Sequence, residues 1–143
     1  MSTSAAVRFV DTNVLLYAVS KDPAESRKTG LALAVLAGDD VALSVQVLQE
    51  FYVQATRPGR TNPLTPQQAS SLVESWLRFP VQESSVELMR AGFLASARYR
   101  ISYWDATIVA AARLLGCSTL LTEDLQDGRD CDGVRIANPF AKA

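Results

Sequence analysis

Four acidic side chains lie beside or inside apolar segments, where a chain seldom places a charge. Asp11 and Asp124 each follow a short apolar run, and Asp105 precedes a long one. Glu50 lies inside the largely apolar segment 45–53. The chain contains no histidine, so general-base chemistry near neutral pH must come from carboxylates or from a metal-bound water.

Several carboxylates in one pocket would create a strong demand for a cation. Two unit charges about 5 Å apart repel each other by about 3 kcal/mol at an effective dielectric constant of about 20. Such groups either take up protons or bind a positive ion. Oxygen ligands without His or Cys select a hard ion such as Mg²⁺ or Mn²⁺. An ion of this kind activates water and polarises a phosphoryl oxygen, which indicates phosphodiester or phosphate chemistry.

Each acid also has a purely structural interpretation. Asp11 fits a turn or an N-cap before a short helix, and Asp105 fits a capping box with Ser102. Glu50 falls on the polar face of its predicted helix. Asp124 belongs to an acid-rich segment that is typical of a solvated loop. The functional interpretation therefore depends on whether the fold brings the four together.

The predicted elements alternate between short strands and helices. With 143 residues, the chain is expected to form one domain, residues 1–143. The pattern predicts an α/β fold, a three-layer α/β/α sandwich with a mainly parallel central sheet of about five short strands. The predicted strands cover residues 7–10, 41–43, 80–82, 118–121 and 134–136. The predicted helices cover residues 14–19, 24–37, 45–56, 65–77, 85–99 and 103–115.

Two of the acids follow predicted strands directly. Ligands of open α/β sheets gather outside the carboxyl ends of the strands. If 7–10 and 118–121 are parallel strands, Asp11 and Asp124 lie at that edge. This placement favours a shared site over two unrelated turns.

Composition excludes several classes of protein. No apolar run approaches the roughly 20 residues of a membrane span, and residues 1–6 carry no cationic segment typical of a secretory signal. Cys117 and Cys131 lack the spacing of a zinc site. They could form one disulfide, but two cysteines without a signal are more typical of free thiols in a reducing cytoplasm. The net charge of −1 gives no overall hint of nucleic-acid binding.

Four short motifs occur in an order typical of a known family. They are Val10-Asp11-Thr12-Asn13-Val14-Leu15, Val47-Leu48-Gln49-Glu50-Phe51, Tyr103-Trp104-Asp105-Ala106 and Leu121-Thr122-Glu123-Asp124-Leu125. In order and spacing they resemble the PIN-domain nucleases, and most closely the VapC-type toxins of bacterial and archaeal toxin–antitoxin pairs. The resemblance covers essentially the whole chain. Each motif is weak alone, whereas four in this order are fairly specific.

The resemblance implies a Mg²⁺- or Mn²⁺-dependent ribonuclease that hydrolyses RNA phosphodiester bonds. The catalytic and metal-binding quartet of the family would correspond to Asp11, Glu50, Asp105 and Asp124. Asp11 and Asp105 would be the main metal ligands, and the other two would complete the coordination or orient water. Asn13 and Thr122 would be supporting polar groups. Asp127 is a competing candidate for the position of the fourth acid, Asp124.

The resemblance also implies partners. These are an RNA substrate, a small antitoxin protein and a second copy of the chain in a homodimer, all in the cytoplasm of a bacterium or archaeon. Apolar positions on helices 24–37 and 65–77 are candidate contact surfaces, although core packing explains them equally well. Candidate phosphate contacts are Arg57, Arg60, Arg98 and Arg100. Tyr103 and Trp104 are candidates for base stacking, with core packing as the alternative.

Two rival functions remain open. In a phosphatase similar to the haloacid dehalogenases, Asp11 would be the nucleophile and Glu123-Asp124 would hold Mg²⁺. That family's first motif has a second acid where this chain has Asn13, and it also needs a positioned lysine, of which the chain has only Lys21, Lys28 and Lys142. The other rival is a PIN-like module that binds RNA or protein without catalysis. Metal-dependent turnover on RNA would separate all three.

Overall fold

The computed structural model describes residues 8–142. Residue 7, the first of the predicted strand 7–10, and residues 1–6, for which no secretory signal is expected, lie outside this range. The strands are β1 (Arg8–Val10), β2 (Val41–Ser44), β3 (Val81–Gln82), β4 (Thr119–Leu121), β5 (Asp130–Cys131) and β6 (Val134–Ala137). The helices are α1 (Thr12–Ala18), the 3₁₀ turn η1 (Pro23–Glu25), α2 (Ser26–Leu36), α3 (Val45–Ala55), α4 (Pro66–Trp76), α5 (Val86–Tyr99) and α6 (Tyr103–Leu114).

The strands form one six-stranded sheet in the order β3-β2-β1-β4-β6-β5. Every neighbouring pair is parallel except β5 and β6, which are antiparallel. The prediction of a mainly parallel sheet is therefore confirmed, and all five predicted strands are present in it. The sixth strand, β5, was not predicted. It has two residues, one of them an aspartate, and it pairs with β6 through a turn in which Asp132 and Gly133 both have positive φ.

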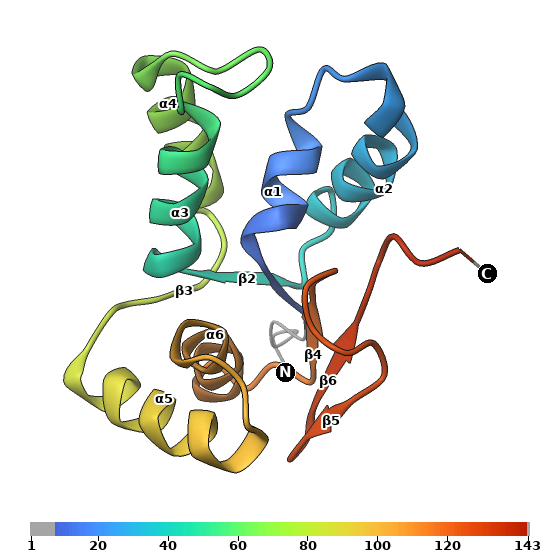
Figure 1. Cartoon of the computed structure of the whole chain (residues 1–143). Helices are drawn as coiled ribbons and strands as arrows, with labels where there is room; N and C mark the ends of the chain where they lie inside the picture. Colours follow the sequence, from blue (N-terminus) through green and yellow to red (C-terminus); the bar gives the residue numbers. More distant parts are fainter. Residues whose placement is uncertain (1–7, 143) are drawn as a thin grey trace.

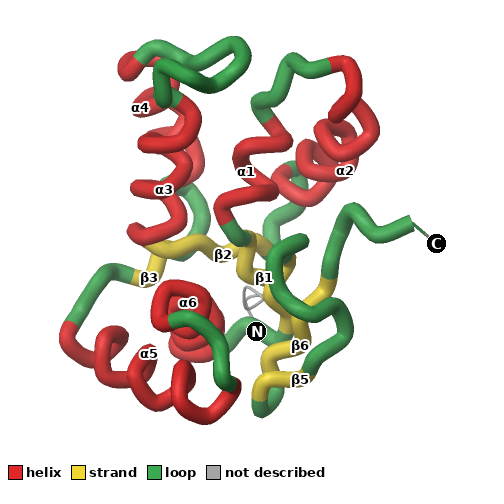
Figure 2. The backbone as a smooth tube through the Cα atoms, viewed as in Figure 1, coloured by secondary structure: helices red, strands yellow, loops and turns green. Residues whose placement is uncertain are grey.

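Helices cover both faces of this sheet, as predicted. Figure 1 shows α1 to α4 on one side and α5 with α6 on the other, and Figure 2 shows the same layers. Helix α6 contacts β2, β4 and β6, while α5 packs on α6 from outside. Residues 106–112 of α6 are all buried, because the helix is enclosed between the sheet and α5. No helix in residues 8–142 is long and apolar enough to cross a membrane.

Side-chain caps set where most of the helices begin. Thr65 caps α4 in a complete capping box with Gln68, and Ser102 accepts a hydrogen bond from the Asp105 amide at the start of α6. Helix α6 ends at Leu114, and Gly116 shortly after it has a φ of 74°, which suits a residue without Cβ. The predicted helix 24–37 begins instead with η1, capped by Asp22, before α2 follows. Cys117 and Cys131 are both buried free thiols, as favoured by the sequence.

The strand order defines a switch point beside β1. The chain runs from β1 outward through β2 to β3, and it then returns to place β4 on the other side of β1. At the carboxyl ends of these neighbours the Asp11 amide donates to the Leu121 carbonyl at 3.0 Å. The loops after β1 and β4 therefore lie together at the place where open α/β sheets bind ligands.

Candidate active site

A cleft of about 230 Å³ lies at the switch point between α1, α3 and the beginning of α6. All four acids singled out from the sequence contribute to its lining, although they are far apart in the chain. Asp11 comes from the end of β1, Glu50 from α3, and Asp105 from the first turn of α6. The lining residues are Asp11, Thr12, Asn13, Leu16, Gln46, Glu50, Gln54, Trp104, Asp105, Ile108 and Asp124.

Asp11 is the buried acid of this group, with 7 % of its surface exposed. Its carboxylate accepts hydrogen bonds from the Thr12 amide at 2.7 Å and from the Thr122 hydroxyl at 2.8 Å. Burial, together with the smaller effect of the negative charges of Asp124 and Glu50, nevertheless raises the pKa of Asp11 to about 6. The two hydrogen bonds therefore do not fully replace the hydration that the Asp11 carboxylate loses on burial. A bound cation would compensate for the remaining cost.

Asn13 ties Asp124 to the same network. Its amide nitrogen donates to the Thr122 hydroxyl at 3.1 Å and to an Asp124 carboxylate oxygen at 3.0 Å. The Asp124 backbone amide also donates to the Thr122 hydroxyl. The carbonyl oxygen of the Asn13 side chain is buried and has no hydrogen-bond partner within the described part of the chain. A buried acceptor without a donor is unusual, and Asn13 is one of the residues that line the cleft.

Glu50 reaches the cleft from α3. Its carboxylate accepts a hydrogen bond from the Thr12 hydroxyl at 3.0 Å, which fixes it beside the start of α1. Gln46 and Gln54, one turn to either side, line the cleft with it. The polar face predicted for this helix is correct, and it is the face that borders the cleft.

Asp105 has the capping geometry only in part. Its backbone amide donates to the Ser102 hydroxyl at 3.1 Å, as a capped first turn requires. Its carboxylate accepts no hydrogen bond within residues 8–142, so the reciprocal half of the predicted capping box is not formed. This carboxylate lines the cleft without a partner to neutralise it.

The donor set suits a hard divalent cation. The available ligands are carboxylate oxygens and an amide oxygen, which Mg²⁺ and Mn²⁺ prefer. The Asp11 carboxylate is buried and has a raised pKa, and the Asn13 amide oxygen has no hydrogen-bond donor within the described residues. The carboxylates share the cleft without crowding together. Over residues 8–142 no three or more Asp, Glu, His or Cys side chains are arranged closely enough to form a metal-ligand cluster by themselves.

The neighbouring acids of the 123–132 segment have other partners. Asp127 accepts a hydrogen bond from the Asn138 backbone N–H at 2.9 Å and does not line the cleft. Glu123 is bound by the Lys28 ammonium at 2.9 Å and by the Tyr17 hydroxyl at 2.5 Å. Of the acids in this segment, Asp124 is the one whose side chain lines the cleft.

Sequence reasoning missed some of the polar groups around the site. Thr12 was not singled out, although its hydroxyl holds Glu50. Gln46 and Gln54, on the polar face predicted for the helix of Glu50, were not singled out either. Their spacing of four residues on either side of Glu50 was a usable signal, because such positions lie on the same side of a helix.

The model of the PIN domain family matches residues 8–126. Several solved structures share the fold. A toxin–antitoxin complex from Klebsiella pneumoniae has a TM-score of 0.69 at 21 % identity, over 93 % of this chain and 98 % of that one. VapC20 of Mycobacterium tuberculosis, described as a sarcin–ricin loop cleaving toxin, has a TM-score of 0.61 at 22 % identity, over 79 % of this chain and 86 % of that one. A DNA-bound VapBC complex from Salmonella typhimurium has a TM-score of 0.63 at 19 % identity, over 93 % of this chain and 98 % of that one.

A comparison with curated proteins gave no match. The cleft gives no support to the phosphatase alternative, since no lysine is among the residues that line it. The family match, residues 8–126, includes Asp11, Glu50, Asp105 and Asp124. The chain belongs to the PIN domain family.

Proposed function

We propose that this protein is a Mg²⁺- or Mn²⁺-dependent ribonuclease and the toxin of a toxin–antitoxin pair. The observation that carries the proposal is the convergence of four carboxylates on one cleft at the switch point of the sheet. The raised pKa of Asp11 supports it, since a buried carboxylate beside two other acids favours the binding of a cation.

In this proposal each side chain has a role that follows from its position. Asp11 and Asp105 are the main metal ligands, because the first is buried at the cleft and the second has no competing hydrogen bond. Glu50 and Asp124 complete the coordination or orient the attacking water. A bound divalent cation would lower the pKa of that water and stabilise charge on the phosphoryl oxygens.

Asn13, Thr122 and Thr12 act as positioning residues. Thr122 donates to Asp11, Asn13 donates to Asp124, and Thr12 donates to Glu50. These bonds hold three of the carboxylates in fixed rotamers, so little ordering remains to be done when an ion binds. The unpartnered oxygen of Asn13 is a further candidate ligand.

The substrate and partners are proposed from the family and from the structural relatives. VapC20 is described as cleaving the sarcin–ricin loop, which supports RNA as the substrate class. The relative from Klebsiella pneumoniae is described as a toxin–antitoxin complex, which supports an antitoxin partner. A protein of this kind would act on RNA in the cytoplasm of its cell.

Two apolar surfaces are candidates for the protein partners. A groove of about 620 Å³ between α3 and α4, with Tyr52, Val53 and Leu77 exposed in it, suits an apolar segment of an antitoxin. Helix α5 exposes Phe93 and Leu94, and we propose this face for a second copy of the chain. Predicted helix 24–37 exposes Leu33, whereas 65–77 contributes to the groove through Leu77.

A cleavage assay tests the proposed function. Purified protein is incubated with total RNA in Mg²⁺, in Mn²⁺ and in EDTA, with Asp11→Asn and Asp105→Asn as matched variants. The proposal expects cleavage in either metal, none in EDTA, and a loss of at least about 100-fold in both variants. Hydrolysis of p-nitrophenyl phosphate but not RNA would favour the phosphatase alternative. RNA binding without metal-dependent turnover would favour the non-catalytic module.

A further inference from the structure

The acidic cleft lies between other hollows of the surface, and the row that they form together is called the groove below. Four hollows on this surface are joined through the residues that they share. Trp104 and Gln46 line both the acidic cleft and a hollow at the beginning of α5. Asn13 and Leu16 line both the acidic cleft and a hollow beside α1. That hollow shares Arg60 with a pocket of about 180 Å³ at the far end of α1.

One end of this groove carries two cations that form no ion pair within residues 8–142, although two acids also line their pocket. Most lysines and arginines of the described chain bind a carboxylate, a carbonyl or a hydroxyl, as Arg98 does with Asp132. Arg60 and Lys21, which line the pocket at the end of α1, have no ion pair or side-chain hydrogen bond within residues 8–142. Arg57, on the same loop as Arg60, has none there either.

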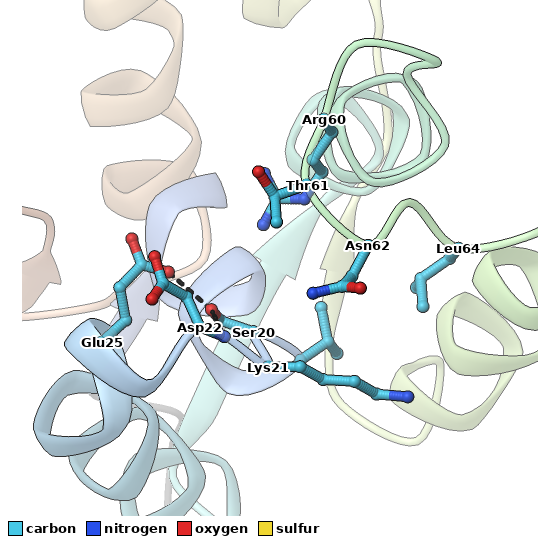
Figure 3. Close-up of a pocket in the computed structure, with 9 residues that line it drawn as sticks. Ser20, Lys21, Asp22, Glu25, Arg60, Thr61, Asn62 and Leu64 are labelled. Carbon is cyan, nitrogen blue, oxygen red and sulfur yellow. Dashed lines mark hydrogen bonds between the residues drawn. The ribbon is translucent and has the colours of Figure 1, made fainter.

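Figure 3 shows how Arg60 is placed in that pocket. Arg60 and Thr61 face Asp22 and Glu25 across the opening, and Lys21 extends away from the two acids. Glu25 accepts the Ser20 hydroxyl, and Asp22 caps the Ala24 amide, so both acids have local partners. Because acids and cations are balanced here, a phosphate would be held by direct contact with Arg60 rather than by long-range attraction.

The other end of the groove carries an aromatic platform. Trp104 is 64 % exposed, which is unusual for so large an apolar side chain, and it adjoins Asp105 at the mouth of the cleft. The Tyr103 ring packs against it edge to face, with ring centroids 4.9 Å apart. The Gln46 amide donates to the Trp104 carbonyl at 3.4 Å. The Tyr103 ring supports the indole, the Gln46 bond holds the Trp104 backbone, and most of the indole stays exposed to a ligand.

We propose that a single strand of RNA lies along this groove, with a base stacked on Trp104 and a backbone phosphate bound by Arg60 on the opposite side of the acids. The inference rests on the proposed function, because it takes the acidic cleft as the place of cleavage. Exposed aromatic rings and arginine side chains are the groups that bind single strands without reading sequence. Helix α1, with seven residues, separates the acids from the pocket by about 10 Å, a length that a few nucleotides can span.

The test measures binding separately from cleavage. A fluorescently labelled single-stranded RNA is titrated with the full chain carrying Asp11→Asn, which removes turnover, and anisotropy gives Kd. Trp104→Ala is expected to raise Kd at least about fivefold. Arg60→Gln is expected to raise Kd and to lower the slope of log Kd against log salt by about 0.7. Leu33→Ala and Arg90→Gln, exposed residues outside the groove, are the matched controls and should leave Kd unchanged.

Recovery of binding in Trp104→Phe would support stacking rather than a structural role for the indole. Equal Kd values for the groove variants and the controls would overturn the inference. So would a loss in Arg90→Gln as large as that in Arg60→Gln, because binding would then follow overall charge. A chain that binds RNA through Trp104 and Arg60 but never cleaves it would support this inference while contradicting the proposed function.

Discussion

Asp11 combines burial with a negative charge that only partly finds compensation. The Thr12 amide and the Thr122 hydroxyl donate to it, yet burial keeps its pKa near 6. A rise from 3.8 to about 6 corresponds to about 3 kcal/mol of interaction that disfavours the charged form. We infer that this cost of keeping Asp11 charged favours cation binding, because a positive ion beside the carboxylate would remove the cost.

Without metal, Asp11→Asn should make the protein more stable at neutral pH. The folded state holds the Asp11 proton more tightly than the unfolded state, so the stability it contributes is present below pH 3.8 and is lost as pH rises to about 6. The variant should therefore exceed the wild type by up to about 3 kcal/mol at pH 7.5, less the weakened hydrogen bond to Thr122. The two should converge near pH 4.

Urea unfolding in EDTA at both pH values measures this difference. The difference in stability between variant and wild type removes the pH dependence that the other carboxylates contribute equally to both. Asp40, whose pKa the Arg8 guanidinium lowers, is one of these. If the variant were less stable than the wild type by the same amount at both pH values, Asp11 would be a structural cap rather than a strained ligand. Asp127→Asn, outside the cleft, is the control and should show no such convergence.

At the scale of elements, the packing of α5 on α6 positions the first turn that carries Asp105. Gly92 of α5 lies against Thr107 of α6, and a Cβ added there would come within 2.7 Å of the Thr107 methyl group. The next contact, with the Tyr103 ring, would be 3.0 Å. Neither neighbour is the far end of a flexible side chain, so the two helices would have to move apart.

Gly92→Ala should destabilise the fold by about 1–3 kcal/mol through this overlap. Gly30→Ala on α2 is the matched control, since nothing lies within 4 Å of its added Cβ. Alanine favours a helix over glycine by up to about 1 kcal/mol, so this control should be stabilised. Urea midpoints measure both effects. An equal increase in stability in the two variants would mean that α5 and α6 are not in close contact.

The predicted elements were those with a clear apolar pattern or a clear cap. The helix caps at Thr65 and Ser102 and the helix end shortly before Gly116 are local signals, so the sequence carries them directly. Strand β5 has two residues and exists because β6 offers it a pairing edge, which no local pattern reveals. The start of α2 was also missed, because Pro23 leads into a 3₁₀ turn first.

The candidate site shows the same division between local and distant information. Asp11 and Asp124 were expected together because both follow strands. The bond from Asn13 to Thr122 joins residues 109 positions apart, and the bond from Thr12 to Glu50 joins residues 38 apart. Such pairs depend on the topology of the whole sheet. The loss of the Asp105 half of the capping box likewise depends on side-chain rotamers that sequence does not fix.

At the scale of the whole molecule, the apolar residues left at the surface are unevenly distributed. Helix α5 exposes Val86, Phe93 and Leu94, the last with 74 % of its surface accessible. These positions lie on neighbouring parts of one helix face. A contiguous apolar face on a small domain is typical of a protein interface, which supports the proposed homodimer.

Leu94→Glu should therefore shift the protein from dimer to monomer. A charge in an apolar interface is costly to desolvate, whereas the same change on the free surface of α5 has little effect on folding. Analytical ultracentrifugation at micromolar concentration gives the mass. Leu33→Glu on α2, at an exposed leucine outside the proposed face, is the control and should remain dimeric. A monomeric wild type would refute the proposed self-association. If Leu33→Glu gave a monomer and Leu94→Glu did not, the interface would lie on α2 instead of α5.

We propose that Asp11, Glu50, Asp105 and Asp124 together hold a divalent cation. Calorimetric titration of Mn²⁺ into the purified chain tests it most directly, with Asp11→Asn and Asp105→Asn beside Asp127→Asn. We expect binding to the wild type and to Asp127→Asn at pH 7.5, and none to the first two variants. Binding should weaken at pH 5 because the ligands must be deprotonated. Unchanged Mn²⁺ affinity in Asp11→Asn and Asp105→Asn would contradict the proposal.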